Sequence, residues 1–335
     1  MAVPAVTVVM PLYQKAGSVI AAIRSVLTQR FADFELVVVD DGSIDEGPAL
    51  VAGEVDSRLR LLRQPNQGPG AARNRGLAEA RGALVAFLDA DDEWDPEFLQ
   101  LGVAALAEAP DCAAWVTGRA EGPTRRTRTG QDRRMGLTDG RWRVSPDVSP
   151  RRLKYYVDFC HSSCVLARRT VVQRYGGYYA ADRYVYGEDS YLWLQLVLNH
   201  ALAIDPEPRV WFHTEHSALG AARMGHHPVR PALLASEPLL AGCDPAYRTA
   251  LRDLLAFYRL LETEQLLRRG QLDAATLAQW RSRFPWARWP GLKLAAMELH
   301  CSAMVMVPGL ARIVPPSQRA ERSPLTEPTS GSKSG

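Results

Sequence analysis

Three aspartates lie within four residues where an apolar run ends: Asp89, Asp91 and Asp92 follow the apolar residues 84–88. Carboxylates this close repel one another, and they are costly beside a core unless a positive group, most simply a divalent cation, lies among their oxygens. The alternative is an acidic helix N-terminus, because the aspartates precede a predicted helix at about residues 96–108 and would favour its dipole. The cluster by itself leaves both interpretations open.

The elements that carry this cluster are predicted to alternate between strands and helices. Apolar runs predict strands at residues 6–10, 35–39, 59–63 and 84–88, and helical spacing predicts helices at residues 19–27 and 70–80. Apolar strands separated by helices indicate a mostly parallel α/β sheet with helices on both faces, and such sheets bind ligands beyond the carboxyl ends of their strands. Pro11, Tyr13 and Asp41 also follow strands, so we expect them to meet the aspartates at one edge of the sheet.

The chain lacks the glycine-rich turn that two classes of nucleotide-binding enzyme usually carry. A dinucleotide fold would show G-x-G-x-x-G after the first strand, but residues 11–17 read PLYQKAG and residues 68–73 read GPGAAR. A sugar nucleotidyltransferase would carry a basic, glycine-rich phosphate loop at the same place. The dehydrogenase hypothesis loses its main support, and the nucleotidyltransferase remains the alternative enzyme class.

Composition limits the compartment and the partners. The 335 residues carry a formal charge of +3 and 23% charged residues, which gives no reason to expect nucleic acid as a partner. The five cysteines form no C-x-x-C pair, and no run of about 18 apolar residues predicts a membrane span. We therefore expect a cytoplasmic protein. Residues 292–307 predict an amphipathic helix, so peripheral contact with the inner face of the membrane stays open, as does a homodimer.

The chain is predicted to divide into three parts. Residues 1–217 form the α/β domain, with an irregular, arginine-rich insertion at residues 119–150 that suits a mobile lid, a basic surface or a solvated loop. Residues 218–314 change to helical spacing, and residues 315–335 have the composition of a disordered tail.

Five segments read VVMPLY at residues 8–13, VVDDGS at 38–43, GPGAARNRG at 68–76, FLDADD at 87–92 and GEDSYLW at 187–193. Taken together, they resemble the inverting glycosyltransferases of family 2, which have the GT-A fold. Each is weak alone, but five in the family's order make a chance resemblance improbable. Gln14 departs from the family, which usually has Asn after the tyrosine. The resemblance implies metal-dependent, hexosyltransferase-type transfer from a UDP- or dTDP-sugar to a hydroxyl of a glycan or lipid-linked acceptor, in surface polysaccharide or glycoconjugate synthesis.

The resemblance also implies roles on the donor side. Tyr13 would stack on the base, and Asp41 would accept a hydrogen bond from a pyrimidine N–H. Each residue also has a structural alternative: Tyr13 would be a strand-end tyrosine, Asp41 a turn-forming aspartate and Arg73 a solvated arginine on a helix face. The implied nucleotide-binding residues are Pro11, Tyr13, Asp41, Arg73 and Asp89. Asp91 would ligate Mn²⁺ or Mg²⁺, with Asp92 orienting the metal or the ribose contact.

On the acceptor side, the resemblance assigns the catalytic base to Asp189. Inverting transfer needs one carboxylate that takes the proton of the attacking hydroxyl, and Glu188 would contact the acceptor. An acidic helix N-terminus is the alternative for this pair. His161 and Ser162 are further candidate acceptor contacts, and His213, in preference to His216, is a candidate ligand of the metal or diphosphate.

Two further hypotheses remain. A retaining transferase or a glycosidase would need a different carboxylate arrangement, which sequence cannot measure. A relative that binds a nucleotide without turnover would not need both Asp91 and Asp189, and the chain has both.

Overall fold

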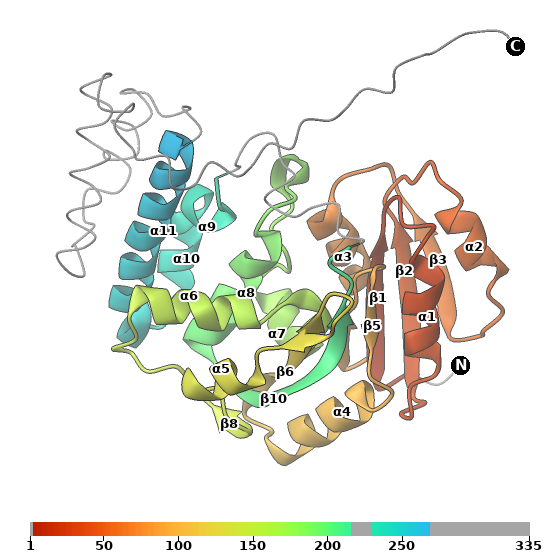
Figure 1. Ribbon diagram of the computed structural model, residues 1–335, viewed down its shortest axis with the longest axis horizontal. Helices are drawn as coiled ribbons and strands as arrows, with labels where there is room; N and C mark the ends of the chain where they lie inside the picture. Colours follow the sequence, from red (N-terminus) through yellow and green to blue (C-terminus); the bar gives the residue numbers. More distant parts are fainter. Residues whose placement is uncertain (1–2, 216–228, 269–335) are drawn as a thin grey trace, which may run out of the picture.

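The computed structural model describes residues 3–215 and 229–268, which form a mixed sheet with helices on both faces (Figure 1). The strands are β1 (Val6–Leu12), β2 (Phe34–Asp40), β3 (Leu59–Arg63), β4 (Leu84–Phe87), β5 (Asp92–Trp94), β6 (Cys112–Glu121), β7 (Arg126–Thr127), β8 (Gly140–Trp142), β9 (Val165–Arg168) and β10 (Ala201–Phe212). The helices are α1 (Val19–Leu27), α2 (Gly47–Gly53), α3 (Pro69–Ala78), α4 (Phe98–Glu108), α5 (Thr129–Arg134), α6 (Pro150–Phe159), α7 (Arg169–Arg174), α8 (Glu188–Asn199), α9 (Pro231–Leu234), α10 (Ser236–Gly242) and α11 (Arg248–Arg268), with short 3₁₀ turns η1 (Ser162–Cys164), η2 (Ala181–Arg183) and η4 (Pro245–Tyr247).

The strand order is β3-β2-β1-β4-β9-β6-β10-β5, with β7 and β8 joined to β6 and β10. β1 to β4 are parallel, as the apolar runs predicted, and every residue of β2 is buried. The rest of the sheet differs from the expectation, because β9 is antiparallel to both β4 and β6, and β5 is antiparallel to β10. The α/β class with flanking helices is confirmed, and the sheet is mixed.

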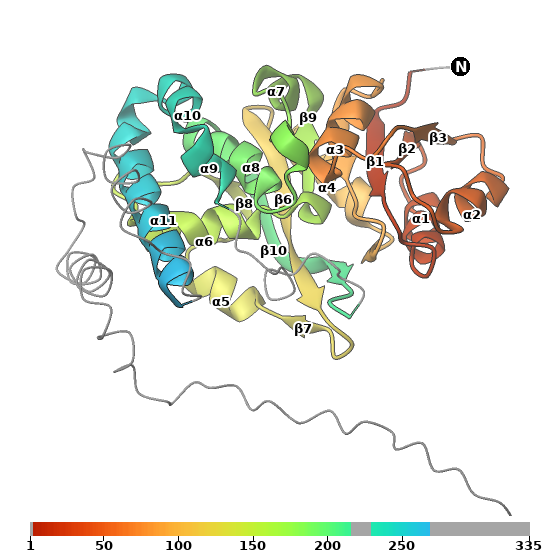
Figure 2. The same ribbon diagram turned by 90° about the horizontal axis from the view of Figure 1, so that it is seen from above.

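Alternate residues of β1 serve the two faces of the sheet. Val8 and Met10 pack in one apolar cluster with α1 and α4, whereas Val9 packs in the other with α6, α8 and α11. In Figure 2, α1 and α4 lie in the right half of the view, and α6, α8 and α11 lie in the left half. Helices cover both faces of the sheet, so the predicted site residues become accessible at the ends of the strands.

The aspartate cluster does not begin a helix. Asp92 enters the short strand β5, and α4 starts six residues later without an acidic residue in its first turn. The helix-dipole explanation of the cluster is therefore wrong. The physical reason is that Asp92–Trp94 pairs with β10, a partner more than a hundred residues away.

Residues 119–150 alternate short regular elements with irregular segments, so the irregular insertion stays a prediction. They contain the end of β6 together with β7, α5 and β8. These elements are two to six residues long apart from β6, too short for a hydrophobic period to be recognised.

The helices after residue 229 share a core with the rest of the protein. Leu254 and Tyr258 of α11 belong to the same buried cluster as Leu153 of α6 and Trp193 of α8. The helical spacing predicted for this region is confirmed within α11, whereas a domain boundary at residue 217 stays a prediction. Residues 269–314 and the expected tail at 315–335 lie outside the described residues.

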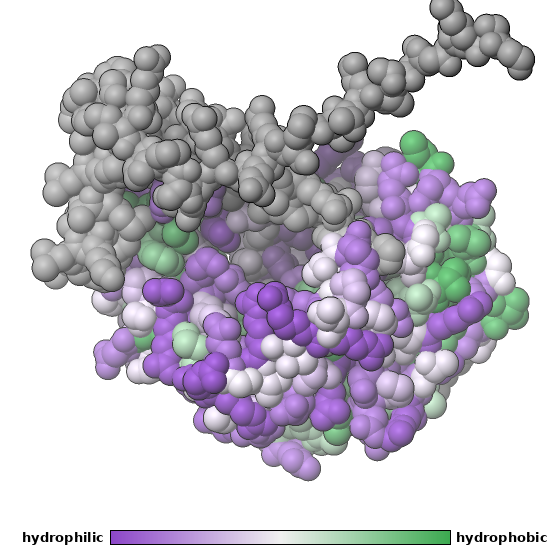
Figure 3. All heavy atoms as spheres, viewed as in Figure 1, coloured by the Kyte–Doolittle hydropathy of each residue, from purple (hydrophilic) through white to green (hydrophobic). Residues whose placement is uncertain are grey.

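The outer surface is mainly hydrophilic on the face seen in Figure 1, as Figure 3 shows. Within residues 3–215 and 229–268, no helix combines the length and apolar character that crossing a membrane would take.

Candidate active site

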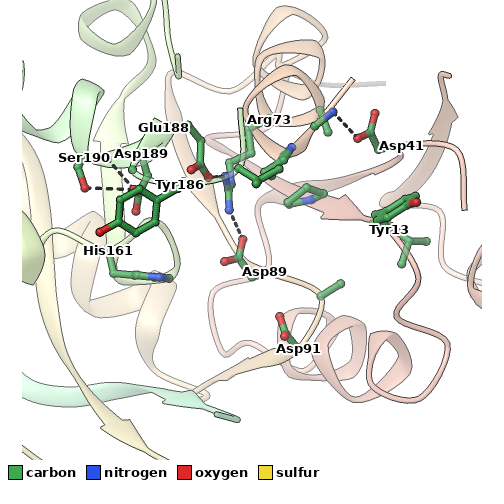
Figure 4. A pocket seen from close by; sticks show the side chains of 18 of the residues that line it. Tyr13, Asp41, Arg73, Asp89, Asp91, His161, Tyr186, Glu188, Asp189 and Ser190 are labelled. Atoms are coloured by element: carbon green, nitrogen blue, oxygen red, sulfur yellow. Dashed lines mark hydrogen bonds and ion pairs between the residues drawn. The ribbon is translucent and has the colours of Figure 1, made fainter. Parts of the chain in front are cut away.

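A cavity of about 720 Å³ lies at the carboxyl ends of β1 and β4 and extends to the start of α8. This volume is within the ordinary range for small-molecule sites. Nine of the predicted site residues line it: Pro11, Tyr13, Asp41, Arg73, Asp89, Asp91, His161, Glu188 and Asp189. Figure 4 labels all of them except Pro11. The two groups of carboxylates, a hundred residues apart in sequence, thus face one space.

Arg73 joins the two groups. Its Nη2 donates to Asp89 Oδ1 at 2.6 Å and its Nη1 donates to Glu188 Oε1 at 2.9 Å. The residue is only 4% exposed, so the alternative of a solvated helix-face arginine is wrong. Its guanidinium also lies 4.9 Å from the centre of the Tyr178 ring. Arg73 therefore fixes the end of β4 relative to the start of α8.

Glu188 and Asp189 occupy the first turn of α8, as the alternative of an acidic helix N-terminus predicted. Their environments differ. Burial and the charge of Asp189 raise the pKa of Glu188 to about 7, although Arg73 opposes the shift. Asp189 accepts hydrogen bonds from the backbone N–H of Ser190 at 2.7 Å and from its hydroxyl at 3.3 Å. Asp189 is thus held by neutral donors, and Glu188 by a cation.

Asp41 organises the wall of the cavity. Its carboxylate accepts hydrogen bonds from Gln64 Nε2 and from the backbone N–H groups of Gln67 and Gly68, each at 2.8 Å. The turn at this strand end is instead closed by Asp40, whose Oδ1 accepts from the N–H of Ser43. The turn-forming explanation therefore applies to Asp40.

Tyr13 is 47% exposed and lines the cavity directly after β1. The next residue, Gln14, has a φ of 55° and donates its N–H to Ser43 Oγ at 3.1 Å. Asn is enriched in this left-handed conformation. That preference gives a physical reason for the Asn that the resembling family usually has here.

The aspartates have three different surroundings. Asp91 forms an ion pair with Lys15, and Asp92 is buried and accepts from Ser163 Oγ at 2.7 Å. Burial and the charges of Asp89 and Asp91 raise the pKa of Asp92 well above its ordinary value. One ligand atom each of Asp89, Asp92 and His161 lies within 4.8 Å of the others. The group that could hold a cation thus differs from the predicted Asp91 and His213.

His161 is oriented by its neighbours. Its Nδ1 accepts from the backbone N–H of Ser163 at 3.4 Å, and its ring lies edge-on to Phe212 at 4.3 Å. Burial lowers the pKa of His161, although the charges of Asp189 and Asp89 oppose the shift. We therefore expect a neutral imidazole at pH 7.

Three of the predicted site residues are not among those that line the cavity: Asp92, Ser162 and His213. Ser162 is buried and its hydroxyl accepts from the Tyr178 hydroxyl at 3.1 Å. His213 contacts Glu93 through Nε2 at 2.7 Å and Glu215 through Nδ1 at 3.1 Å. His216 lies outside the described residues. Their predicted roles remain predictions.

The family model described as glycosyl transferase family 2 matches residues 7–176, just over half of the chain. The chain belongs to glycosyltransferase family 2. The resemblance noted in the sequence is therefore confirmed.

Curated relatives match parts of this family 2 chain. Succinoglycan biosynthesis protein ExoO of Rhizobium meliloti is 48% identical over 99 residues, which are 29% of this chain and 28% of ExoO. The Escherichia coli UDP-Glc:alpha-D-GlcNAc-diphosphoundecaprenol beta-1,3-glucosyltransferase WfgD is 28% identical over 203 residues, 59% of this chain and 72% of WfgD. The chain thus covers less than a third of ExoO.

Solved structures are similar in fold. The structure of S. aureus TarS 1–349 in complex with UDP-GlcNAc has a TM-score of 0.65 at 17% identity. The match covers 92% of this chain and 87% of the TarS chain. The mannosyltransferase PcManGT from Pyrobaculum calidifontis, in complex with GDP-Man and Mn²⁺, has a TM-score of 0.54 at 20% identity, covering 92% and 82%. At these identities the likeness shows the GT-A fold alone.

The cavity of this family 2 member also contains residues that the sequence did not single out: Lys15, Lys154, Asp158, Tyr186 and Arg230. A signal for two of them was present. Only four of the 40 basic residues are lysines, and two of these four line the cavity. Arg230 had no such signal, because it follows the α/β region and belongs to no motif.

Proposed function

We propose that the protein is an inverting glycosyltransferase that moves a sugar from a pyrimidine nucleotide diphosphate donor to an acceptor hydroxyl. The observation that carries this proposal is the pairing of the cavity carboxylates. Arg73 holds Asp89 and Glu188, and Lys15 holds Asp91. Asp41 and Asp189 both line the cavity and accept hydrogen bonds from neutral donors only. Asp41 is 2% exposed and both of its oxygens already accept hydrogen bonds, which leaves Asp189 as the candidate base.

Asp189 would be the catalytic base. A carboxylate without a cationic partner keeps lone pairs with which to accept the proton of the acceptor hydroxyl. The oxygen of that hydroxyl then attacks the anomeric carbon as the bond between this carbon and the diphosphate breaks. Asp189 lies across the cavity from Tyr13 and Asp41 (Figure 4), which suits attack from the side opposite the nucleotide. Glu188, held by Arg73, would orient the acceptor.

The donor nucleotide would lie along the ends of β1 and β2. Tyr13 offers an exposed ring face for the base, and Asp41 lies at the same cavity wall, where it holds the backbone of Gln67 and Gly68. The similar TarS structure is a complex with UDP-GlcNAc, which supports a pyrimidine. PcManGT is a complex with GDP-Man, so the base requires a direct test.

The acidic cluster fits a hard divalent cation. Asp89 and Asp92 provide oxygen ligands, and His161 provides a nitrogen. Asp91 would join the set if Lys15 moved away. Mg²⁺ or Mn²⁺ bound there would neutralise charge on the leaving diphosphate.

The acceptor would be a glycan or a lipid-linked sugar in surface polysaccharide synthesis. ExoO is named for succinoglycan biosynthesis, and the acceptor in the name of WfgD is a sugar diphosphate on a lipid. A cytoplasmic location at the inner face of the membrane would suit such an acceptor.

Calorimetric titration of the full chain with UDP, dTDP, GDP and CDP, each with Mn²⁺ or with a chelator, tests the donor site. We expect one pyrimidine diphosphate to bind, and to bind only when the metal is present. Binding to none of the four nucleotides would refute the proposed donor site.

Replacing Tyr13 with alanine should weaken binding of that nucleotide by about 1–3 kcal/mol, the range of one base stacked on an aromatic ring. The melting temperature should hardly change, because nearly half of the side chain is exposed. Calorimetry and thermal unfolding of the same samples check both statements. An unchanged nucleotide affinity would mean that Tyr13 does not stack on the base and is an ordinary strand-end residue.

A further inference from the structure

Helix α11 carries a buried carboxylate, Glu262, that is only 1% exposed. Its Oε1 lies 2.9 Å from Nε of Arg230. Burial raises the pKa of Glu262 to about 7, although Arg230 opposes the shift. A buried acid is costly and weak evidence for stability, so its effect on Arg230 is the feature to explain.

Arg230 is fixed from several sides. Its Nη2 donates to the hydroxyl of Tyr186 at 2.8 Å, and its Cζ lies 5.1 Å from the centre of the Tyr186 ring and 4.9 Å from that of Tyr258. Arg230 nevertheless lines the cavity, with 15% of its side chain exposed. A guanidinium has five N–H donors in a rigid fork, and Glu262 and Tyr186 engage only part of it among the described side chains. Such a fork matches the oxygens of a phosphate group.

The position of Arg230 points to the acceptor. Tyr186, to which it donates, lies three residues before Asp189 in the chain. In Figure 4, Tyr186 lies with Asp189 on the opposite side of the cavity from Tyr13 and Asp41, and Tyr186 is close enough to feel the charge of Asp189. Arg230 is thus anchored on the side from which a hydroxyl would attack.

We propose that Arg230, positioned by Glu262 and Tyr186, binds a phosphate group of the acceptor next to the hydroxyl that Asp189 deprotonates. This inference rests on the proposed transferase function and gives helix α11 a role in it. The phosphate could belong to a lipid-linked sugar or to the glycan itself, and both sources offer the same oxygens.

The test uses the full chain saturated with UDP and Mg²⁺, so that phosphate cannot occupy the donor site. Inorganic phosphate is titrated in one arm, and detergent micelles containing a polyprenyl phosphate in the other. We expect binding in at least one arm, and the tighter arm identifies the source. Arg230→Gln should weaken that binding at least tenfold while the Kd of UDP changes less than twofold.

Three more variants separate positioning from folding. Glu262→Gln should weaken phosphate binding by a smaller factor, since Arg230 keeps its charge but loses its anchor. Arg230→Lys should restore part of the loss, because an ammonium keeps the charge without the fork. Arg126→Gln, a control whose side chain is 74% exposed, should change nothing. Thermal unfolding confirms that each variant is folded.

Two results would overturn the inference. Phosphate binding that is absent in both arms, or equal in the wild type and Arg230→Gln, removes the acceptor site. A loss of UDP affinity in Arg230→Gln as large as the loss of phosphate affinity would assign Arg230 to the donor. Failure of the proposed function looks different, because the wild type would then bind no nucleotide.

Discussion

Asp189→Asn should lower the rate of sugar transfer by about 10²–10⁴, the usual contribution of a positioned base. Asparagine has nearly the same shape and cannot accept the proton of the acceptor hydroxyl. Its amide oxygen can still accept from Ser190, so the start of α8 should keep its geometry. Nucleotide affinity should stay within about twofold of the wild type, because Asp189 lies across the cavity from Tyr13 and Asp41. Transfer rate and calorimetry on the same preparation check this.

The matched control is Asp111→Asn. Asp111 is about half exposed and pairs with Arg141, outside the cavity. This substitution should leave both transfer and nucleotide binding unchanged. Near wild-type transfer by Asp189→Asn would mean that another group takes the proton, and the assignment of the base would be wrong.

Arg73→Ala should destabilise the protein by about 3–5 kcal/mol, the usual effect of removing one partner of a buried ion pair. The substitution leaves Asp89 and Glu188 without their shared cation in a buried setting. It also frees the end of β4 from the start of α8, so transfer should be lost together with stability. Urea unfolding followed by circular dichroism measures the change in the free energy of unfolding.

Arg75→Ala provides the control on the same helix. Arg75 pairs with Glu79 one turn on, and 54% of its side chain is exposed. Exposed pairs of this kind contribute about 0.3–0.5 kcal/mol, so the variant should unfold almost as the wild type does. Equal destabilisation by the two substitutions would show that Arg73 acts through the helix and not through the two carboxylates.

The part of the fold that could be predicted from sequence is the part with strong local patterns. Runs of apolar residues in β1 to β4 predicted parallel strands. The rule that ligands bind at the carboxyl ends of such strands predicted that Tyr13, Asp41 and Asp89 lie close together. The acidic start of α8 was recognisable as well, although nothing local stated that it faces the same space.

The rest depended on contacts between distant residues. Arg73 bonds to Glu188, 115 positions away, and Lys15 to Asp91, 76 positions away, so no spacing rule could find either pair. Asp92 enters a strand only because β10 lies beside it. Arg230 reaches the cavity through its buried contact with Glu262 of α11, far from any motif.

The anomeric configuration of the released sugar tests the central claim most directly. UDP-α-glucose and UDP-α-N-acetylglucosamine are incubated with the protein and Mn²⁺, so that water takes the place of the acceptor, and proton NMR is recorded before mutarotation. The account predicts release of the β-anomer by the wild type and a loss of about 10²–10⁴ in that rate for Asp189→Asn. Release of the α-anomer, or an undiminished rate in the variant, would contradict single-step inverting transfer with Asp189 as the base.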